Sequence, residues 1–338
     1  MPRLLRALLA LAAGLVLAGC TDRHLGFLHP HGAVADAQLT HLLEVVGLVM
    51  IVIVPPLILL PLVAWRYRRR KNRSASYQPN WGFSWTLDIL AWGVPILIVG
   101  VMAVLLVRNT HRLDPYRAIM PGVAPERVQV IAYDWKWLFI YPDEGIASVN
   151  ELAFPADRPL ALELTSRTVM QSFQIPALGG QIYAMGGMVT QLHLTADQPG
   201  LYPGQNTNFN GRGFHQQKFV ANALSPEDFK AWVARARSSP LQLDRSTAEL
   251  LAERSTMAEF HVGLARMTGG GALSATATAP ATLLQPGSVA AVTRAPPVYF
   301  SRVPEHFFES LVSRTMQGRT PEPAPLPAPG TQTTEAHP

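Results

Sequence analysis

Two long apolar runs, separated by a strongly basic segment, constrain the fold of this chain more than any other feature. The runs occupy residues 39–66 and 87–108. About 20 apolar residues are enough to cross a bilayer as a helix, so each run predicts a transmembrane helix. Hydrophobic residues make up 48% of the chain and charged residues 15%, a balance typical of a membrane protein. Four prolines lie inside the runs, which favours helices that pack against other helices: Pro55, Pro56, Pro61 and Pro95.

The basic segment between the runs, residues 67–86, sets the orientation of this helical hairpin. It contains Arg68, Arg69, Arg70, Lys71 and Arg73, and no acidic residue. Short basic loops between membrane helices stay in the cytoplasm. The remainder of the chain after the second helix is therefore predicted to be periplasmic. The basic cluster is explained by topology, so we predict no nucleic-acid partner.

The only cysteine, Cys20, ends a stretch with the features of a secretory signal. Arg3 and Arg6 precede an apolar core, and the small residues Ala18 and Gly19 stand directly before the cysteine. This ending resembles the bacterial lipobox, which implies a signal peptide at 1–19, cleavage, and lipid on the Cys20 sulfur. Residues 20–38 then form a polar periplasmic linker. A buried structural cysteine near the end of an N-terminal helix is the alternative.

Short alternating segments follow the second membrane run and predict a β-sandwich over residues 125–222. Strands of this kind, separated by turns at intervals of about 8 to 12 residues, are typical of such sandwiches. In the strand at 190–195, Leu192 and Leu194 are expected to face the core. The strands are expected at 128–141, 149–154, 160–165, 172–176, 181–185, 190–195 and 214–221.

The part of the chain after the sandwich predicts a C-terminal helical region at 223–316. Ser225 is a suitable N-cap for a helix at 226–237, with acidic residues in the first turn and arginines in the last. Residues 240–265 are expected to be partly helical, 267–293 a flexible insertion, and 298–314 helical. The Pro-rich residues 317–338 predict a disordered tail.

A polar loop at 204–219 has the position of a ligand-binding loop but few metal ligands. His193 is predicted to be a surface residue, and His215 has no neighbouring histidine to share a metal. Met185 and Met188 are expected to be packing residues. A single cysteine also excludes disulfides and thiolate-rich metal sites. The sequence contains no catalytic triad and no phosphate-binding loop.

The aromatic segment from Asp134 to Pro142 resembles subunit II of the haem-copper terminal oxidases. The resemblance continues through residues 149–155, 172–176 and 181–188, and covers about residues 20–237. It implies two transmembrane helices followed by a cupredoxin-like periplasmic β-sandwich. In the cytochrome c oxidase branch this sandwich holds a dinuclear copper centre bound by two Cys, two His, a Met and one backbone carbonyl.

This chain has no copper ligand at the positions that the resemblance assigns to them. The two histidine positions hold Gln171 and Phe214, and the methionine position holds Gln217. The remaining three, two cysteine positions and the carbonyl donor between them, hold Asn206, Asn210 and Asn208. Neutral amides are weak ligands for copper, which favours thiolate and imidazole. The chain is therefore similar to the quinol oxidase branch of the cytochrome bo type, which lacks this copper and carries a lipobox.

Asp88, at the cytoplasmic start of the second helix, has two interpretations. A carboxylate near a helix N-terminus is stabilised by the helix dipole. The resemblance instead implies the entrance of a proton pathway into subunit I, where the family usually has Glu. The shorter Asp leaves the geometry of that entrance open.

Together these features predict subunit II of a proton-pumping ubiquinol oxidase in a bacterial inner membrane. The resemblance implies no cofactor in this chain, with haems and copper in subunit I. It implies subunit I, further small membrane subunits and membrane lipid as partners, and ubiquinol as the substrate of the complex. The alternatives are a copper-binding cytochrome c oxidase subunit II and a lipoprotein adapter with a cupredoxin-like module.

Overall fold

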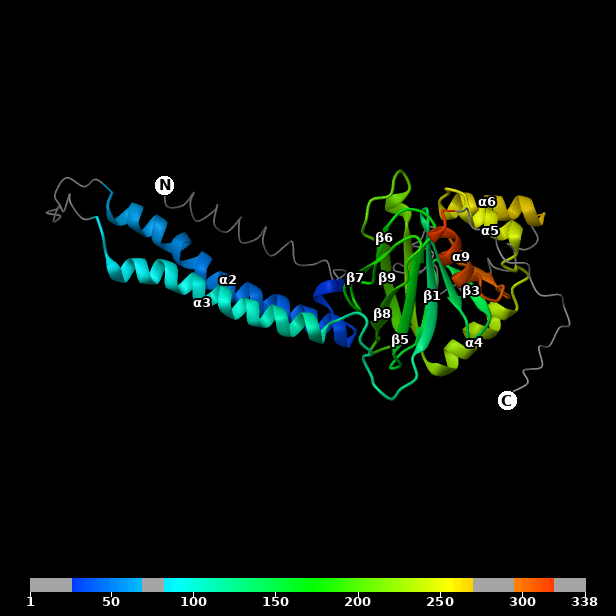
Figure 1. The fold of residues 1–338 in the computed structure, drawn as a ribbon, viewed down its shortest axis with the longest axis horizontal. Coiled ribbons are helices and arrows are strands. Elements are labelled where there is room, and N and C mark those ends of the chain that lie inside the picture. Colours follow the sequence, from blue (N-terminus) through cyan, green and yellow to red (C-terminus); the bar gives the residue numbers. More distant parts are fainter. Residues whose placement is uncertain (1–25, 69–81, 270–294, 319–338) are drawn as a thin grey trace, which may run out of the picture. The chain divides into compact units, whose positions relative to one another are not determined.

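The computed structural model describes residues 26–68, 82–269 and 295–318, which form two compact units, a helical hairpin and a larger body. The hairpin, residues 37–114, consists of most of α2 (Ala33–Arg66) and all of α3 (Trp85–Arg112), as Figure 1 shows. Both helices are long and apolar enough to cross a membrane. Cys20 and most of the basic loop lie outside the described residues.

Both helices extend beyond the predicted apolar runs. Helix α2 begins at Ala33, so the last part of the predicted 20–38 linker is helical. Three alanines favour helix here, and Asp36 lies in its first turn, where the helix dipole stabilises a carboxylate. At the outer ends of the helices, the Asn109 amide and His41 Nδ1 lie 2.7 Å apart and join α3 to α2. Apolarity therefore marks the membrane segment, not the helix ends.

The body is a sandwich of two sheets, which confirms the predicted fold class. One sheet has the order β11-β3-β2-β1-β5-β8 and the other β4-β10-β9-β6-β7. The pairs β1–β5 and β4–β10 are parallel, and the other pairs are antiparallel. The strands are β1 (Glu126–Tyr133), β2 (Lys136–Tyr141), β3 (Ile146–Val149), β4 (Glu151–Pro155), β5 (Leu160–Ser166), β6 (Gln171–Gln174), β7 (Gln181–Ala184), β8 (Thr190–Leu194), β9 (Gly200–Asn206), β10 (Lys218–Leu224) and β11 (Val298–Phe300).

An aromatic core lies between the two sheets. Trp137 packs edge-on against Phe173 and Phe219, whose rings are stacked 4.7 Å apart. Leu192 and Leu194 are buried as predicted. Rings of this size supply much of the buried apolar surface that stabilises such a domain.

Two strands predicted as continuous are in fact pairs. Residues 128–141 fold into β1 and β2, joined by a tight turn in which Trp135 adopts a positive φ of 67°. Residues 149–154 divide at Asn150, φ 61°, so that β3 and β4 lie in different sheets. A positive φ is uncommon for residues other than glycine, so the alternating pattern gave no sign of either break.

The predicted strand at 214–221 begins too early. Phe214–Gln216 form a short 3-10 helix, η2, and β10 starts only at Lys218. Gly211, at φ 112°, reverses the chain just before this turn. The turn directs Gln217 inward, which is important for the site described below.

The C-terminal region is helical except for one strand. The helices are α4 (Pro226–Arg237), α5 (Arg245–Ala252), α6 (Met257–Thr268) and α9 (Phe307–Met316). Ser225 caps α4 as predicted, accepting a hydrogen bond from Asp228 N. The prediction of helix at 298–314 is wrong for its first residues, since Val298–Phe300 pair with β3 as strand β11. Aromatic and β-branched residues favour this edge position. Residues 270–294 and 319–338, most of the predicted insertion and tail, lie outside the described residues.

Candidate functional site

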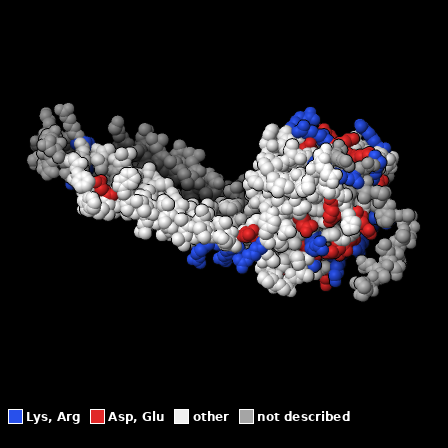
Figure 2. Space-filling model, in the orientation of Figure 1, with Lys and Arg blue, Asp and Glu red and all other residues white. Residues whose placement is uncertain are grey.

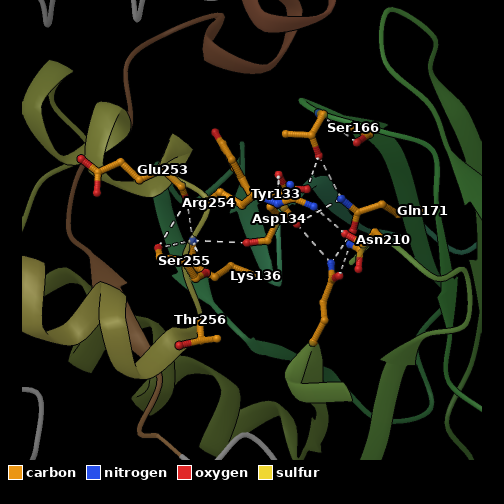
Figure 3. A network of polar contacts seen from close by, with 12 residues as sticks. Tyr133, Asp134, Lys136, Ser166, Gln171, Asn210, Glu253, Arg254, Ser255 and Thr256 are labelled. Atoms are coloured by element: carbon orange, nitrogen blue, oxygen red, sulfur yellow. Dashed lines mark hydrogen bonds and ion pairs between the residues drawn. The ribbon is translucent and has the colours of Figure 1, made fainter. Parts of the chain in front are cut away.

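Four of the six positions that the resemblance assigns to copper ligands come together in one buried cluster of amides. Gln171 opens β6, Asn206 closes β9, and Asn210 and Gln217 belong to the loop between β9 and β10. All four side chains are buried, with at most 6% of each residue exposed. We call these four residues the amide cluster; Figure 3 shows part of it.

Gln217 lies at the centre of the amide cluster. Its side-chain oxygen accepts hydrogen bonds from the amides of Asn206 at 3.0 Å and Asn210 at 2.7 Å. Its nitrogen donates to the Tyr133 carbonyl at 3.2 Å and to the side-chain oxygen of Gln171. Gln171 in turn donates to the same Tyr133 carbonyl at 3.1 Å. One side chain thus links β6, β9 and the end of β1.

Asn206 folds the loop onto itself. Its Oδ1 accepts from the backbone N–H groups of Ser172 at 2.9 Å and Asn208 at 3.0 Å. Its Nδ2 also donates to the Asn208 carbonyl. Asn208 is half-exposed and donates to the Met170 carbonyl at 2.8 Å. An asparagine side chain that bonds backbone two residues ahead is a common turn device.

Phe214, the sixth of these positions, does not join the amide cluster. Its half-buried ring packs edge-on against Phe209, with centroids 5.6 Å apart. Phe209 itself is 76% exposed. The aromatic pair therefore forms the outer tip of the loop.

A second layer of contacts joins the loop to the C-terminal region. Arg254, between α5 and α6, donates to the Asn210 carbonyl at 3.0 Å and lies 3.5 Å from the Asp134 carboxylate. Its guanidinium also covers the Trp135 ring at 5.2 Å from the centroid. Gly213 also lies against this ring, since an added Cβ there would be only 2.1 Å from the indole. Trp135 thus contacts both the loop and Arg254.

Lys136 anchors the same C-terminal junction from β2. Its buried ammonium donates to the Glu253 carbonyl at 3.0 Å, the Ser255 carbonyl at 2.7 Å and the Ser255 hydroxyl at 2.8 Å (Figure 3). Burial lowers the pKa of Lys136 to about 8, against the opposing effect of Asp134 and two glutamates. Lys136 was not predicted as a site residue, although a lysine within an otherwise apolar strand indicates a buried polar contact.

The donor set of the amide cluster does not fit a dinuclear copper centre. Copper pairs of this kind need bridging thiolates, whereas these side chains are neutral amides. Their oxygens are engaged in hydrogen bonds, apart from Asn210 Oδ1. Within residues 26–68, 82–269 and 295–318, no group of three or more His, Cys, Asp and Glu side chains could hold a metal ion.

The other residues considered as ligands lie apart from the amide cluster's hydrogen bonds. His193 is half-buried on β8 and contacts the Pro115 carbonyl through Nδ1 at 3.0 Å. His215 is exposed and lies next to the Gln216 amide. Met185 is half-buried, but Met188 is 53% exposed, so its prediction as a packing residue is wrong.

The hairpin carries the remaining predicted site residue, Asp88. It lies in the first turn of α3, and its side chain is exposed on the hairpin surface. Its backbone N–H bonds the Ser84 carbonyl, as in an ordinary helix start. The carboxylate is therefore available to a partner.

Comparisons with known proteins agree with the fold. The family described as "Cytochrome C oxidase subunit II, periplasmic domain" matches residues 144–223. The cytochrome bo(3) ubiquinol oxidase subunit 2 of Pseudomonas putida is 44% identical over 71% of this chain and 76% of its own length. The chain belongs to the ubiquinol oxidase subunit 2 family. The family includes ubiquinol oxidase subunit 2 of Acetobacter aceti, 44% identical over 72% of this chain and 79% of the relative.

More distant relatives are described as subunits of quinol oxidases. Quinol oxidase subunit 2 of Bacillus subtilis is 35% identical over 72% of this chain and 75% of the relative. As a ubiquinol oxidase subunit 2, this chain is a membrane protein with two candidate spans and a periplasmic domain. It is one subunit of an oxidase complex.

Proposed function

We propose that this ubiquinol oxidase subunit 2 has no copper centre and supports a proton-pumping complex whose haems and copper are held by subunit I. The amide cluster carries this proposal. Where the resemblance puts bridging thiolates, Asn206 and Asn210 both donate to the Gln217 oxygen. The hydrogen bonds replace the metal as the link that closes the loop. Electrons from ubiquinol then enter through another subunit.

The test is the spectrum of the purified oxidase complex. A thiolate-bridged copper pair gives a near-infrared absorbance and a characteristic electron paramagnetic resonance signal, and we expect neither. Metal analysis should find only the copper that belongs to the haem-bearing subunit. A thiolate-copper signal assigned to this subunit would overturn the proposal and favour a cytochrome c oxidase subunit II.

An apolar area of the periplasmic domain supports docking on the haem-bearing subunit. Five residues at or near the β6–β7 edge and one at the end of α9 expose 40% or more of their surface. Exposed apolar area that exceeds the ordinary surface of a soluble domain marks interaction sites. Figure 2 shows few charges on the side where Figure 1 labels β6, β7 and β8. The six residues are Val169, Met170, Tyr183, Met188, Val189 and Met316.

Photo-crosslinking distinguishes this oxidase subunit from a free-standing lipoprotein adapter. A photoreactive residue at Met188 should crosslink to the haem-bearing subunit in membranes. The same residue at Ala234, exposed on α4, serves as the control and should not. Crosslinks to no haem protein, together with a haem-free complex in mild detergent, would favour the adapter.

The proton-entrance role belongs to Asp88, whose exposed carboxylate at the start of α3 can face a neighbouring subunit. Acidic residues at membrane depth commonly serve proton pathways. Lipidation of Cys20 would add an anchor at the outer face of a bacterial inner membrane. Mass spectrometry of the mature chain tests it: the expected N-terminus is a diacylglyceryl-modified Cys20, and an unmodified Met1 would contradict it.

A further inference from the structure

One side of helix α3 carries an open apolar groove. The residues that line it all belong to α3, and two of them, Leu97 and Val104, are 69% and 60% exposed. An added Cβ at Gly100 would meet no atom within 4 Å, so the groove is open at this position. We call it the α3 groove. It is lined by Ile96, Leu97, Gly100, Val101, Val104 and Leu105.

Helix α2 lies against a different side of α3. The Asn109 amide of α3 lies 2.7 Å from His41 Nδ1 of α2, and Ile98 of α3 is buried. Successive residues of a helix are rotated by about 100°. Ile98 and Asn109 therefore point to nearly the same side of α3, a quarter-turn or more away from Leu97 and Val104. Helix α2 consequently leaves the α3 groove uncovered.

Two arginines stand on the groove side of α3. Val104, Arg108 and Arg112 follow one another at intervals of four residues, which is the spacing of neighbours along one helix face. Both arginines are exposed. The helix dipole stabilises a cation in the last turn, where Arg112 lies, but Arg108 comes a full turn earlier. Within α3 the only carboxylate is Asp88, in the first turn. The groove therefore ends in a pair of positive charges.

The α3 groove and the two arginines match the depth profile of one lipid leaflet. Helix α3 leads into the periplasmic domain, so Arg108 and Arg112 lie at the outer end of the span. The charge bias that keeps basic loops in the cytoplasm does not explain arginines at this end. The lining residues precede Arg108 by about 5–18 Å along the helix axis. The hydrocarbon of one leaflet is about 15 Å thick, so an acyl chain along the groove would have its headgroup beside the arginines.

We propose that the α3 groove binds an anionic phospholipid of the outer leaflet, with the phosphate between Arg108 and Arg112 and one acyl chain along the groove. Guanidinium groups bind phosphate oxygens through strong, often bidentate hydrogen bonds. Two cations at one headgroup favour a lipid with a net negative charge over a zwitterionic one. The arginines select lipid over a second protein helix, because that helix would need its own anion at this depth, whereas every phospholipid leaflet supplies phosphate there. This site goes beyond the proposed function and requires only that the hairpin is inserted with the periplasmic domain outside.

A photoreactive residue in the α3 groove identifies what covers it. A diazirine side chain replaces Val104 in the full oxidase complex. The complex is reconstituted in vesicles of phosphatidylethanolamine that contain phosphatidylglycerol as the minor, anionic lipid. Mass spectrometry after illumination identifies each adduct by its mass. We expect phosphatidylglycerol adducts to be enriched at least about threefold over the share of this lipid in the bilayer.

Three variants test the two halves of the site. Arg108→Gln/Arg112→Gln should return the lipid adducts to the bilayer ratio. Lys230→Gln/Arg235→Gln, at exposed positions of α4, is the matched control and should retain the enrichment. Gly100→Leu, which fills the groove, should lower the yield of lipid adducts.

Adducts to the haem-bearing subunit in place of lipid would overturn the proposal, because protein would then cover the groove. Lipid adducts in the bilayer ratio, or enrichment that survives Arg108→Gln/Arg112→Gln, would overturn it as well. Haem content and quinol turnover of each preparation test the proposed function separately, so the two can fail independently.

Discussion

Gln217 accepts a hydrogen bond from Asn210 at 2.7 Å, and the same oxygen accepts a second from Asn206. Two amide donors therefore converge on one buried carbonyl, at positions where the resemblance predicts sulfur ligands. A convergent hydrogen-bonded network is worth more than its separate pairs. These hydrogen bonds consequently hold the loop in a closed shape.

Removing the central amide should destabilise the periplasmic domain. Gln217→Leu keeps the approximate volume but removes the acceptor that the Asn206 and Asn210 amides share, and Asn206 keeps only its bond to the Asn208 carbonyl. Such losses cost about 2–4 kcal/mol in total. Thermal unfolding of the purified complex, followed by circular dichroism, measures it. Gln216→Leu, at the half-exposed neighbour, is the control and should change stability little.

A methyl group at Gly213 should displace Trp135. Gly213 has an ordinary φ of −90°, so Gly213→Ala introduces no backbone strain. The new Cβ would lie 2.1 Å from the indole ring, and overpacking of this kind costs about 1–3 kcal/mol. Faster hydrogen exchange in the loop would report the displacement. The double variant with Trp135→Leu should regain part of the loss, and strictly additive losses would contradict a direct clash.

Lys136 should give the domain a measurable pH dependence. Its pKa is about 8 in the folded protein and near 10.5 ordinarily. Between these values the unfolded chain binds more protons, so the stability of the wild-type protein rises with pH relative to Lys136→Met. Below pH 8 both states are protonated and the difference is constant. Over the whole window the change is roughly 3 kcal/mol.

Unfolding midpoints of both proteins, measured from pH 7 to 10.5, test the Lys136 prediction. The other titrating groups contribute equally to the two proteins, so their difference isolates Lys136. Parallel curves would show that the lysine keeps its ordinary pKa despite its burial.

Asp88→Asn should slow proton uptake and oxidase turnover severalfold, whereas Asp88→Glu should retain them. Only a titratable group can pass protons, while either acid can interact with the helix dipole. Glu44→Gln, which alters the exposed acid at the other end of the hairpin, is the matched control. If turnover and proton pumping are unchanged in Asp88→Asn, the proton-entrance role is wrong and the helix-dipole interpretation remains.

The segment that precedes α2, residues 26–32, is bound to the sandwich through the His31 backbone, which bonds the Ala177 carbonyl and the Asp197 N–H. A substitution at its buried Gly32 should disrupt this contact. Gly32→Ala places a methyl 2.2 Å from the Thr195 backbone oxygen, which no side-chain rotation can relieve. We expect the hydrogen bonds of His31 to break and the segment around it to become susceptible to proteases. His29→Ala, at an exposed position of the same segment, should remain resistant to proteases.

Local patterns predicted most of the fold because membrane spans, alternating strands and helix caps have signals in adjacent residues. The strand breaks at Trp135 and Asn150 were not predicted, because the positive φ values of these residues depend on surrounding contacts. Strand β11 was not predicted for a related reason: its residue Tyr299 pairs with Ser148, which lies about 150 residues earlier in the chain.

The sequence identified the residues of the amide cluster, but it did not predict how their side chains are arranged. Position-by-position resemblance identified Gln171 and Gln217, yet gave no sign of the hydrogen bond between them. The Tyr133 carbonyl that both bind is a backbone atom, which sequence does not distinguish. Arg254 lies outside the region that the resemblance covers, and only the folded structure brings it to Asn210.

Strand β11 is the last strand of the sandwich to be synthesised, so the sheet that contains β3 is completed late. Val298–Phe300 cover the open edge of β3, and Tyr299 hydrogen-bonds the buried Glu151. During synthesis and export, β3 remains an unpaired edge until nearly the last described residues have crossed the membrane. Unpaired edges recruit other chains. A translocation arrest or a premature stop before residue 298 would therefore leave an aggregation-prone intermediate, anchored to the membrane by a hairpin that has already inserted.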